Sequence, residues 1–316
     1  MSAKAGPRTL RPTIAVVQFS PKIGRVEENI KTAWRFCEKL APGSIDLVCL
    51  PEMAFTGYVF PDASSIAPYL EEPQTGPTSR FCAELASRLR CYVTAGYPEK
   101  LPQEEVEVGV DSEGLKFPKI GANSAVLYGP NGEWVGGYRK TNLFETDMTW
   151  AKAGSGFISF DLPPPLGIVT LGICMDLNAQ PPAIWTLEGP YEIAEYCILK
   201  KTNLLVMLNA WLDSGKDAES EYDLDTLNYW ARRLWPLWEH EAPEADAIKE
   251  PLSGLEHVPE TAVVICNRCG EENGKTFAGS SALLSLRSKS GKPRVLDVMT
   301  RHQEGLEIWT IHTSAP

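Results

Sequence analysis

The sequence predicts an α/β fold in which mixed sheets and helices form a layered sandwich. Apolar strand-like runs alternate with amphipathic helical runs in the first half of the chain, and strand-like runs crowd its end. This pattern is typical of sheets covered by helices. No repeat and no long linker interrupts the 316 residues. We therefore expect a disordered lead-in over residues 1–12 and a single domain over residues 13–316.

Each element of the first half has its own periodic signal. Continuous runs of Ile, Val and Leu indicate buried strands, and apolar residues three or four positions apart indicate helices. Pro21 ends the first strand and Pro51 ends the second. These signals predict strands over 13–19, 46–50 and 91–97, and helices over 27–40 and 77–89.

The second half contains more strands and two irregular segments. The Pro130-Asn131-Gly132 turn predicts a hairpin of strands 123–128 and 133–138. Residues 99–120 lack periodicity and are expected to form a surface loop or a short hairpin. The acidic residues 239–260 are expected to form a solvated insertion. The other predicted elements are helices 188–199 and 224–238 and strands 166–173, 204–208, 262–266, 280–286, 294–298 and 306–312, the last three as a meander.

Composition limits the kinds of partner and the location. The net charge of −11 disfavours binding to nucleic acid or to an anionic membrane surface. No apolar run reaches the roughly 18–20 residues that cross a bilayer, and the first residues lack the apolar core of a signal peptide. The eight cysteines form no disulfide framework, so we expect reduced thiols in the cytoplasm or the nucleus.

Three ionisable residues each follow a predicted strand. Cys174 follows the run 166–173, Glu52 follows 46–50, and Lys140 follows 133–138. A free cysteine is usually a small core residue, and its position alone favours that interpretation of Cys174. The other two residues change this view, because catalytic groups gather on loops held by a rigid scaffold. We expect the three to converge at one sheet edge.

The three side chains together suit nucleophilic catalysis. A thiol is a weak nucleophile at neutral pH until a base takes its proton. A buried carboxylate such as Glu52 can act as general base and then as general acid. A fixed ammonium such as that of Lys140 favours the thiolate and can stabilise an oxyanion, which is worth roughly 3–4 kcal/mol of barrier.

Two other arrangements are less attractive. None of the four histidines stands at the end of a strand in the half that carries Cys174, which disfavours a Cys-His dyad; they are His240, His257, His302 and His312. The lone Cys266–Cys269 pair has no second pair of zinc ligands and is expected to be structural. We therefore predict neither a metal nor a cofactor.

The order Pro51-Glu52, Tyr138-Arg139-Lys140 and Gly172-Ile173-Cys174-Met175-Asp176 resembles the nitrilase (carbon–nitrogen hydrolase) superfamily. The resemblance extends from Ile14 to about Ile311. It includes Gln18 and the segments 123–125, 140–144, 209–211, 267–274 and 277–281. It implies a four-layer αββα sandwich of the nitrilase type with mixed sheets.

Three stretches, 51–58, 172–178 and 227–238, are similar to the protein N-terminal amidase branch of that superfamily. Commoner members have an aromatic residue and then Asp-x-Arg after the cysteine. Here Met175 takes the aromatic position, and the arginine is replaced by Asn178 or lost. This departure argues against the generic small-amide and carbamoyl hydrolases.

The resemblance implies hydrolysis of the side-chain amide of N-terminal Asn or Gln in peptides and proteins. The products would be N-terminal Asp or Glu and ammonia, and the new N-terminus would feed the N-degron degradation pathway. Carried over by position, Cys174 is the nucleophile, Glu52 the general base and Lys140 the transition-state stabiliser. The N–H of Met175 would be the second oxyanion donor.

The resemblance also implies supporting and binding residues. Many members have a second glutamate after the lysine; Glu145 fits best, and Asp147 remains an alternative. Asp176 and Glu145 are candidates for the substrate's α-ammonium, although Asp176 could equally brace the loop after the cysteine. Tyr58, Asn209 and Trp211 are expected to line the pocket, with Trp211 equally compatible with the core.

Other functions remain open at the level of sequence. The same chemistry could serve an omega-amidase, a carbamoyl-amide hydrolase or a nitrilase acting on a small molecule. From another class, the chain could be a non-catalytic scaffold relative, although all three reactive residues are present. The resemblance allows a homodimer, and the insertion after Trp238 could block the usual interface.

Overall fold

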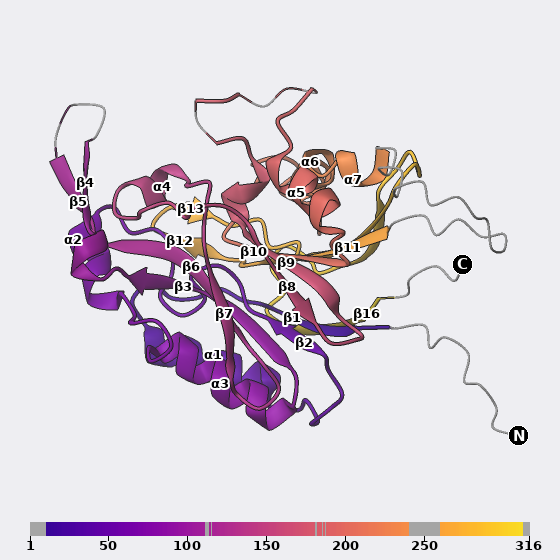
Figure 1. Ribbon diagram of the computed structural model, residues 1–316, viewed down its shortest axis with the longest axis horizontal. Helices are drawn as coiled ribbons and strands as arrows, with labels where there is room; N and C mark the ends of the chain where they lie inside the picture. Colours follow the sequence, from indigo (N-terminus) through magenta and orange to yellow (C-terminus); the bar gives the residue numbers. More distant parts are fainter. Residues whose placement is uncertain are drawn as a thin grey trace, which may run out of the picture.

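The computed structural model describes residues 11–311 except 111–113, 115, 181, 185, 187 and 240–259. Two six-stranded sheets face each other, and helices cover their outer faces (Figure 1). This arrangement confirms the predicted αββα sandwich with mixed sheets. The predicted lead-in and the acidic insertion lie almost entirely outside the described residues.

The first sheet carries the amino-terminal strands. Three central strands run parallel, and the strands at both sides are antiparallel to their neighbours. In spatial order the strands are β16 (Gly305–Thr310), β1 (Thr13–Gln18), β2 (Leu47–Cys49), β3 (Tyr92–Lys100), β6 (Gly121–Tyr128) and β7 (Trp134–Arg139).

The second sheet has the same plan. Its parallel strands are again central and are flanked by antiparallel ones. The order is β15 (Arg294–Val298), β14 (Ala282–Arg287), β11 (Glu260–Asn267), β10 (Leu204–Asn209), β9 (Gly167–Ile173) and β8 (Ile158–Leu162). Parallel strands of one sheet end at a common edge, so both sheets present strand ends for a site.

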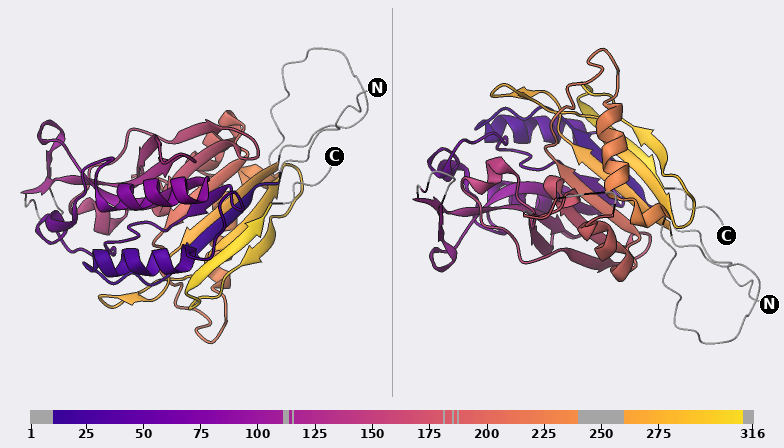
Figure 2. Two further views of the ribbon diagram at one scale, coloured as in Figure 1. Left: turned by 90° about the horizontal axis from the view of Figure 1, so that it is seen from below. Right: turned by 90° about the horizontal axis from the view of Figure 1, so that it is seen from above.

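Helices cover each sheet from outside, as two further views show (Figure 2). Helices α1 (Val26–Cys37) and α3 (Pro77–Leu89) pack on the first sheet. Helices α5 (Glu192–Lys200), α6 (Leu224–Arg233) and α7 (Pro236–Glu239) cover the second. In the described part of the chain, no helix is long and apolar enough to cross a membrane.

Shorter elements connect these layers. They are α2 (Ala63–Ile66), η1 (Ala67–Tyr69), η2 (Gln103–Glu105), β4 (Glu107–Val110), β5 (Lys116–Lys119), α4 (Glu145–Met148), η3 (Cys174–Leu177), β12 (Glu271–Glu272) and β13 (Lys275–Thr276). Strands β4 and β5 pair antiparallel, so of the two alternatives expected for residues 99–120, a surface loop or a short hairpin, the structure has the hairpin.

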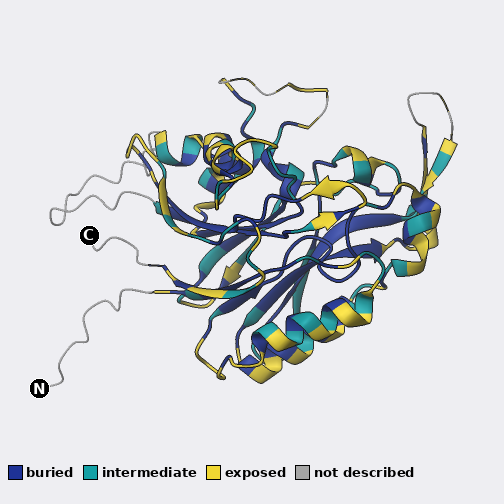
Figure 3. Ribbon diagram, turned by 180° about the vertical axis from the view of Figure 1, so that it is seen from behind, coloured by how far each residue is buried: buried dark blue, intermediate teal, exposed yellow. Residues whose placement is uncertain are grey.

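The alternation of side chains along each strand builds three apolar layers. On β1, Ile14 and Val16 lie between the two sheets, whereas Ala15 and Val17 face the helices. Both faces of the central strands are therefore buried (Figure 3). This explains why they read as continuous apolar runs rather than as alternating ones.

Apart from the short elements, the structure differs from the predicted elements at four places. The last strand, β16, leaves the expected meander and pairs with β1 in the other sheet. The predicted helix 224–238 breaks before Pro236, which has no N–H to continue it. Helix α5 begins only after Pro190, which disfavours helical backbone in the preceding residue. Strand β8, 158–162, was not predicted, because its residues are only half-buried.

Gly96 on β3 packs directly against the backbone of the turn after β2, and a substitution there tests how closely the two are packed. A Cβ at this position would lie 2.5 Å from Glu52 Cα and 2.7 Å from the backbone nitrogen of Met53. We expect Gly96→Ala to lower the free energy of unfolding by about 1–3 kcal/mol through overpacking. Gly129→Ala is the matched control, since its Cβ would meet only the flexible, exposed side chain of Glu133. Chemical denaturation measures both, and equal stabilities would contradict the expectation.

Candidate active site

The three predicted reactive residues converge at one end of the sandwich. Glu52 follows β2 and Lys140 follows β7 in the first sheet, whereas Cys174 follows β9 in the second. Lys140 Nζ lies 2.7 Å from Glu52 Oε1, and both side chains are fully buried. The charges of Glu52 and Lys140 both act on the Cys174 thiol. The layers therefore bring together three groups that are far apart in sequence.

Three donors hold the Glu52 carboxylate. Oε1 accepts hydrogen bonds from Lys140 Nζ and from Asn123 Nδ2, each at 2.7 Å. Oε2 accepts one from the backbone N–H of Ala210 at 2.7 Å. Burial raises the pKa of Glu52, the Lys140 ammonium opposes this, and the Asp147 carboxylate raises it further. A raised pKa is what a general base needs to take a proton from a thiol.

Asp147, and not Glu145, is the second acid beside the lysine. Asp147 Oδ2 lies 2.6 Å from Lys140 Nζ and is fully buried, whereas Glu145 is exposed. Asp147 Oδ2 also accepts the N–H of Phe144 at 3.0 Å, which folds its side chain back toward the lysine. The structure thus places Asp147, the alternative, and not the preferred Glu145, where a supporting acid would contact the lysine. Burial opposes the charge on Lys140, but Asp147 and Glu52 together raise its pKa.

Asn123 joins the two carboxylates and received no role from sequence. Its Nδ2 donates to Glu52 Oε1 at 2.7 Å and to Asp147 Oδ1 at 2.9 Å. Its backbone carbonyl oxygen accepts the backbone N–H of Lys140 at 2.8 Å. The sequence feature that could have identified Asn123 is its polar side chain within the buried strand β6. A buried amide of this kind must be hydrogen-bonded, which points to a partner at that position.

Cys174 occupies a strained turn at the end of β9. Its φ of 43° lies in the left-handed region that side chains rarely adopt. The Asn209 side chain holds this turn by accepting the Cys174 N–H on Oδ1 at 3.0 Å. Burial raises the pKa of the thiol, Glu52 adds to this, and Lys140 opposes it. The resting thiol is therefore neutral and needs a base.

Asp176 braces the loop that follows the cysteine. Its Oδ1 accepts the N–H groups of Thr141 (3.0 Å) and Asn142 (2.8 Å), and its Oδ2 accepts Tyr138 Oη and the N–H of Ile173, each at 2.8 Å. The residue is fully buried. Its oxygens are thus occupied by internal donors, which favours the bracing role over contact with a substrate ammonium.

The four remaining predicted binding residues differ in their surroundings. Tyr58 is buried against the site, with its ring centroid 5.7 Å from Lys140 Nζ. Asn209 is fully buried and positions the Cys174 backbone. Trp211 is partly buried and packs against Tyr229, at 5.6 Å between ring centroids. Met175 is partly exposed directly after the cysteine.

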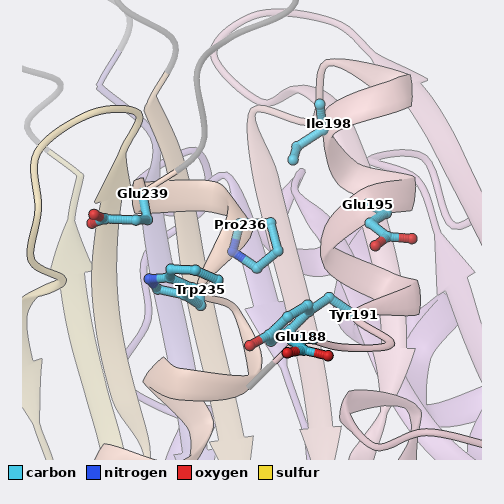
Figure 4. Close-up of a pocket in the computed structure, with 7 residues that line it drawn as sticks. All are labelled: Glu188, Tyr191, Glu195, Ile198, Trp235, Pro236 and Glu239. Atoms are coloured by element: carbon cyan, nitrogen blue, oxygen red, sulfur yellow. The ribbon is translucent and has the colours of Figure 1, made fainter. Parts of the chain in front are cut away.

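Two surface pockets lie elsewhere. One, of about 340 Å³, lies between α5 and α7 and is lined by Glu188, Tyr191, Glu195, Ile198, Trp235, Pro236 and Glu239 (Figure 4). The other, of about 530 Å³, contains Tyr138 and Arg139 but none of the three reactive residues. Cys266 and Cys269 are buried free thiols. Among the described residues no group of His, Cys, Asp and Glu could hold a metal ion.

Comparisons with known proteins agree with this geometry. Residues 13–186 match the carbon-nitrogen hydrolase family. The chain is 31% identical to a protein N-terminal amidase of Schizosaccharomyces pombe, over 92% of this chain and 96% of that protein. It is 28% identical to a protein N-terminal amidase of Saccharomyces cerevisiae, over 64% of this chain and 45% of that protein.

Solved structures share the fold. A crystal structure of an N-terminal amidase with an Asn-Glu-Ala peptide superposes with a TM-score of 0.76 at 20% identity. The match covers 96% of this chain and 98% of that chain. The family match, the curated relatives and the arrangement of strand ends lead to one conclusion: this chain belongs to the carbon–nitrogen hydrolase family and is a hydrolase of amide C–N bonds.

Proposed function

We propose that this protein is an N-terminal amidase that converts N-terminal Asn or Gln of peptides and proteins to Asp or Glu with release of ammonia. The observation that carries the proposal is the buried Glu52–Lys140–Asp147 cluster beside Cys174. The similarity to the Schizosaccharomyces pombe protein N-terminal amidase supports the substrate. Solved N-terminal amidases of this fold hold peptides that begin with Asn or Gln.

In the proposed first half-reaction, Glu52 takes the thiol proton of Cys174 and the thiolate attacks the side-chain amide carbon. A C–S bond forms, and the carbonyl oxygen becomes an oxyanion next to the Lys140 ammonium and the N–H of Met175. Protonated Glu52 then gives its proton to the nitrogen, the C–N bond breaks, and ammonia leaves. A thioester at Cys174 remains.

Hydrolysis of the thioester completes the cycle. Glu52, again a carboxylate, takes a proton from a water molecule that attacks the thioester carbon. The C–S bond breaks, the thiol is restored, and the side chain leaves as a carboxylic acid. Glu52 thus acts in both halves, which is why its hydrogen bonds to Asn123 and Ala210 fix its orientation.

Asp147 makes this base effective. With Lys140 as its only charged neighbour, Glu52 would be held in its ionised form and would be a poor base. The Asp147 carboxylate, 2.6 Å from Lys140 Nζ, offsets that effect. The two carboxylates and one ammonium also leave one excess negative charge in the buried site. That charge suits a substrate with a free α-ammonium.

Other substrates of the same chemistry compete with this proposal. An omega-amidase, a carbamoyl-amide hydrolase and a nitrilase would share the Cys-Glu-Lys arrangement and need no α-ammonium. A non-catalytic scaffold is disfavoured, because such a protein would have no use for three buried charges beside a strained cysteine.

The cellular setting of the reaction is part of the proposal. The eight cysteines are buried and free, which suits a reducing compartment such as the cytoplasm or the nucleus. The product, an acidic N-terminal residue, would feed the N-degron pathway. Association as a homodimer and the absence of nucleic-acid and membrane partners stay predictions, and sedimentation measures the first of them.

A peptide panel tests the proposed substrate. We expect ammonia release from peptides that begin with Asn or Gln and none from their N-acetylated or internal counterparts, because both lack the ammonium. Free asparagine, free glutamine and a small ω-amide are assayed in parallel as substrates that represent the alternative small-molecule activities. Equal rates on acetylated peptides would reject the N-terminal assignment.

Asp147 and Glu145 lie on the same short helix, α4, and variants of the two test which carboxylate supports catalysis. We expect Asp147→Asn to lower kcat by about 10²-fold, the low end of what a positioned general base contributes, since Glu52 becomes less basic. Glu145→Gln should leave kcat nearly unchanged, because its side chain lies in solvent. Steady-state ammonia release measures both. An increase in KM alone for Glu145→Gln would assign that residue to the substrate's ammonium; the reverse order in kcat would reinstate it as the supporting acid.

Asp176→Asn separates bracing from substrate binding. An amide keeps only one acceptor oxygen, so its NH2 group would face the two donors that now bind either Oδ1 or Oδ2. We expect a loss of about 2–4 kcal/mol in the free energy of unfolding, the cost of two unsatisfied buried donors. Denaturation and steady-state kinetics are measured together. A rise in KM with unchanged stability would show that Asp176 binds the ammonium instead.

A further inference from the structure

A hairpin near the end of the chain contacts the loop that carries Tyr58. Strands β12 and β13 pair across the turn Asn273-Gly274, where both residues have positive φ angles (47° and 74°). Tyr58 N and the Glu272 carboxylate are separated by 214 residues in sequence, yet they are in hydrogen-bond contact. The mechanism proposed above gives this hairpin no role.

Glu272 holds the backbone on both sides of the Tyr58 side chain. Its Oε1 accepts the N–H of Tyr58 at 2.7 Å and the N–H of Val59 at 2.5 Å. A Cβ on Gly57 would lie 2.6 Å from Oε2, so only glycine leaves room for this carboxylate. Asn273 adds a third contact by donating Nδ2 to the carbonyl oxygen of Val59 at 3.1 Å.

Arg268 supports Glu272 from the other side. Its Nη1 lies 2.7 Å from Glu272 Oε2, and the arginine side chain is fully buried. Its guanidinium also stacks over the ring of Phe277, 3.9 Å from the ring centroid. Phe277 in turn makes an edge contact with the Tyr58 ring, with centroids 6.4 Å apart. The pair Arg268–Glu272 therefore reaches Tyr58 through its backbone and through its ring.

The Tyr58 side chain stands among the reactive groups. Its ring centroid lies 5.7 Å from Lys140 Nζ. Its buried hydroxyl lies beside the Asp147 carboxylate, near enough to interact with it but without the distance and angle of a full hydrogen bond. Burial raises the pKa of this hydroxyl, and the negative charges of Asp147 and Glu52 add to the effect. It therefore stays protonated and remains a donor for a bound molecule.

We propose that Glu272 and Arg268 are positioning residues that hold the Tyr58 hydroxyl in the active site as a hydrogen-bond donor to the bound substrate. Stability alone does not explain the arrangement, because a buried ion pair gains little over apolar residues of similar size. What a carboxylate at position 272 supplies, and an apolar residue cannot, is an acceptor for two N–H groups of the Tyr58 loop. The proposal rests on the N-terminal amidase function for its substrate.

A matched pair of double variants isolates that acceptor. Both remove the ion pair, so neither leaves an unpaired buried charge. R268M/E272Q keeps an oxygen that can accept the loop N–H groups, whereas R268M/E272M removes it at similar volume. We expect kcat/KM for an Asn-peptide to be at least about tenfold lower in R268M/E272M than in R268M/E272Q, because small misplacements near the chemistry can cost up to about 10²-fold.

The Tyr58→Phe background shows whether the effect runs through the hydroxyl. With that hydroxyl absent, the two double variants should differ by less than about threefold, since coupled residues are non-additive. An undiminished difference in this background, or equal kcat/KM for the two double variants in the Tyr58 background, overturns the proposal. Thermal midpoints of all variants are measured in parallel.

Two additions keep the test decisive. If R268M/E272M does not fold, Glu272→Asp replaces it, because the shorter side chain keeps the charge but draws the acceptor away from the loop; an unchanged kcat/KM would then overturn the proposal.

If the wild type releases no ammonia from Asn or Gln peptides, the amidase proposal fails. The positioning claim is then tested by alkylation of Cys174 with iodoacetamide. The pH profile of the alkylation rate should shift in R268M/E272M but not in R268M/E272Q. Identical profiles in the two double variants would reject the positioning claim.

Discussion

The site depends on one interaction, the contact of the Lys140 ammonium with two buried carboxylates. Nζ lies 2.7 Å from Glu52 and 2.6 Å from Asp147, and all three side chains are inaccessible to solvent. Removing one member would leave an uncompensated charge in a dry interior, which costs several kcal/mol. The ends of β2 and β7 and the short helix α4 must therefore stay in register. The geometry of Glu52, the proposed base, follows from that constraint.

The second sheet adds the proposed nucleophile to this charged centre. Cys174 directly follows β9, in the sheet opposite the one that supplies Glu52 and Lys140. Asn209 at the end of β10 holds its backbone, and the N–H of Ala210, the next residue, donates to Glu52. The residues after β10 thus fix both the Cys174 backbone and the Glu52 carboxylate. The proposed chemistry therefore depends on the face-to-face packing of the sheets.

Much of this arrangement could be predicted from the sequence. Buried strands read as apolar runs, and the positions of Glu52, Lys140 and Cys174 directly after three such runs predicted their convergence. The choice between Glu145 and Asp147 could not be made, since it depends on which side chain folds back over the start of α4. The roles of Asn123 and Glu272 were missed for a related reason. Their partners lie 71 and 214 residues away in sequence, and no local pattern records such contacts.

The central claim is that Cys174 forms a thioester with the side-chain acyl group of an N-terminal Asn or Gln while Glu52 carries the proton. Mass spectrometry of the protein quenched soon after mixing with an Asn-peptide tests it most directly. The account predicts an adduct of the peptide less one ammonia, located on Cys174, that is lost on hydrolysis and does not form in Glu52→Gln. An adduct on another residue, or undiminished formation without the Glu52 carboxylate, would contradict it.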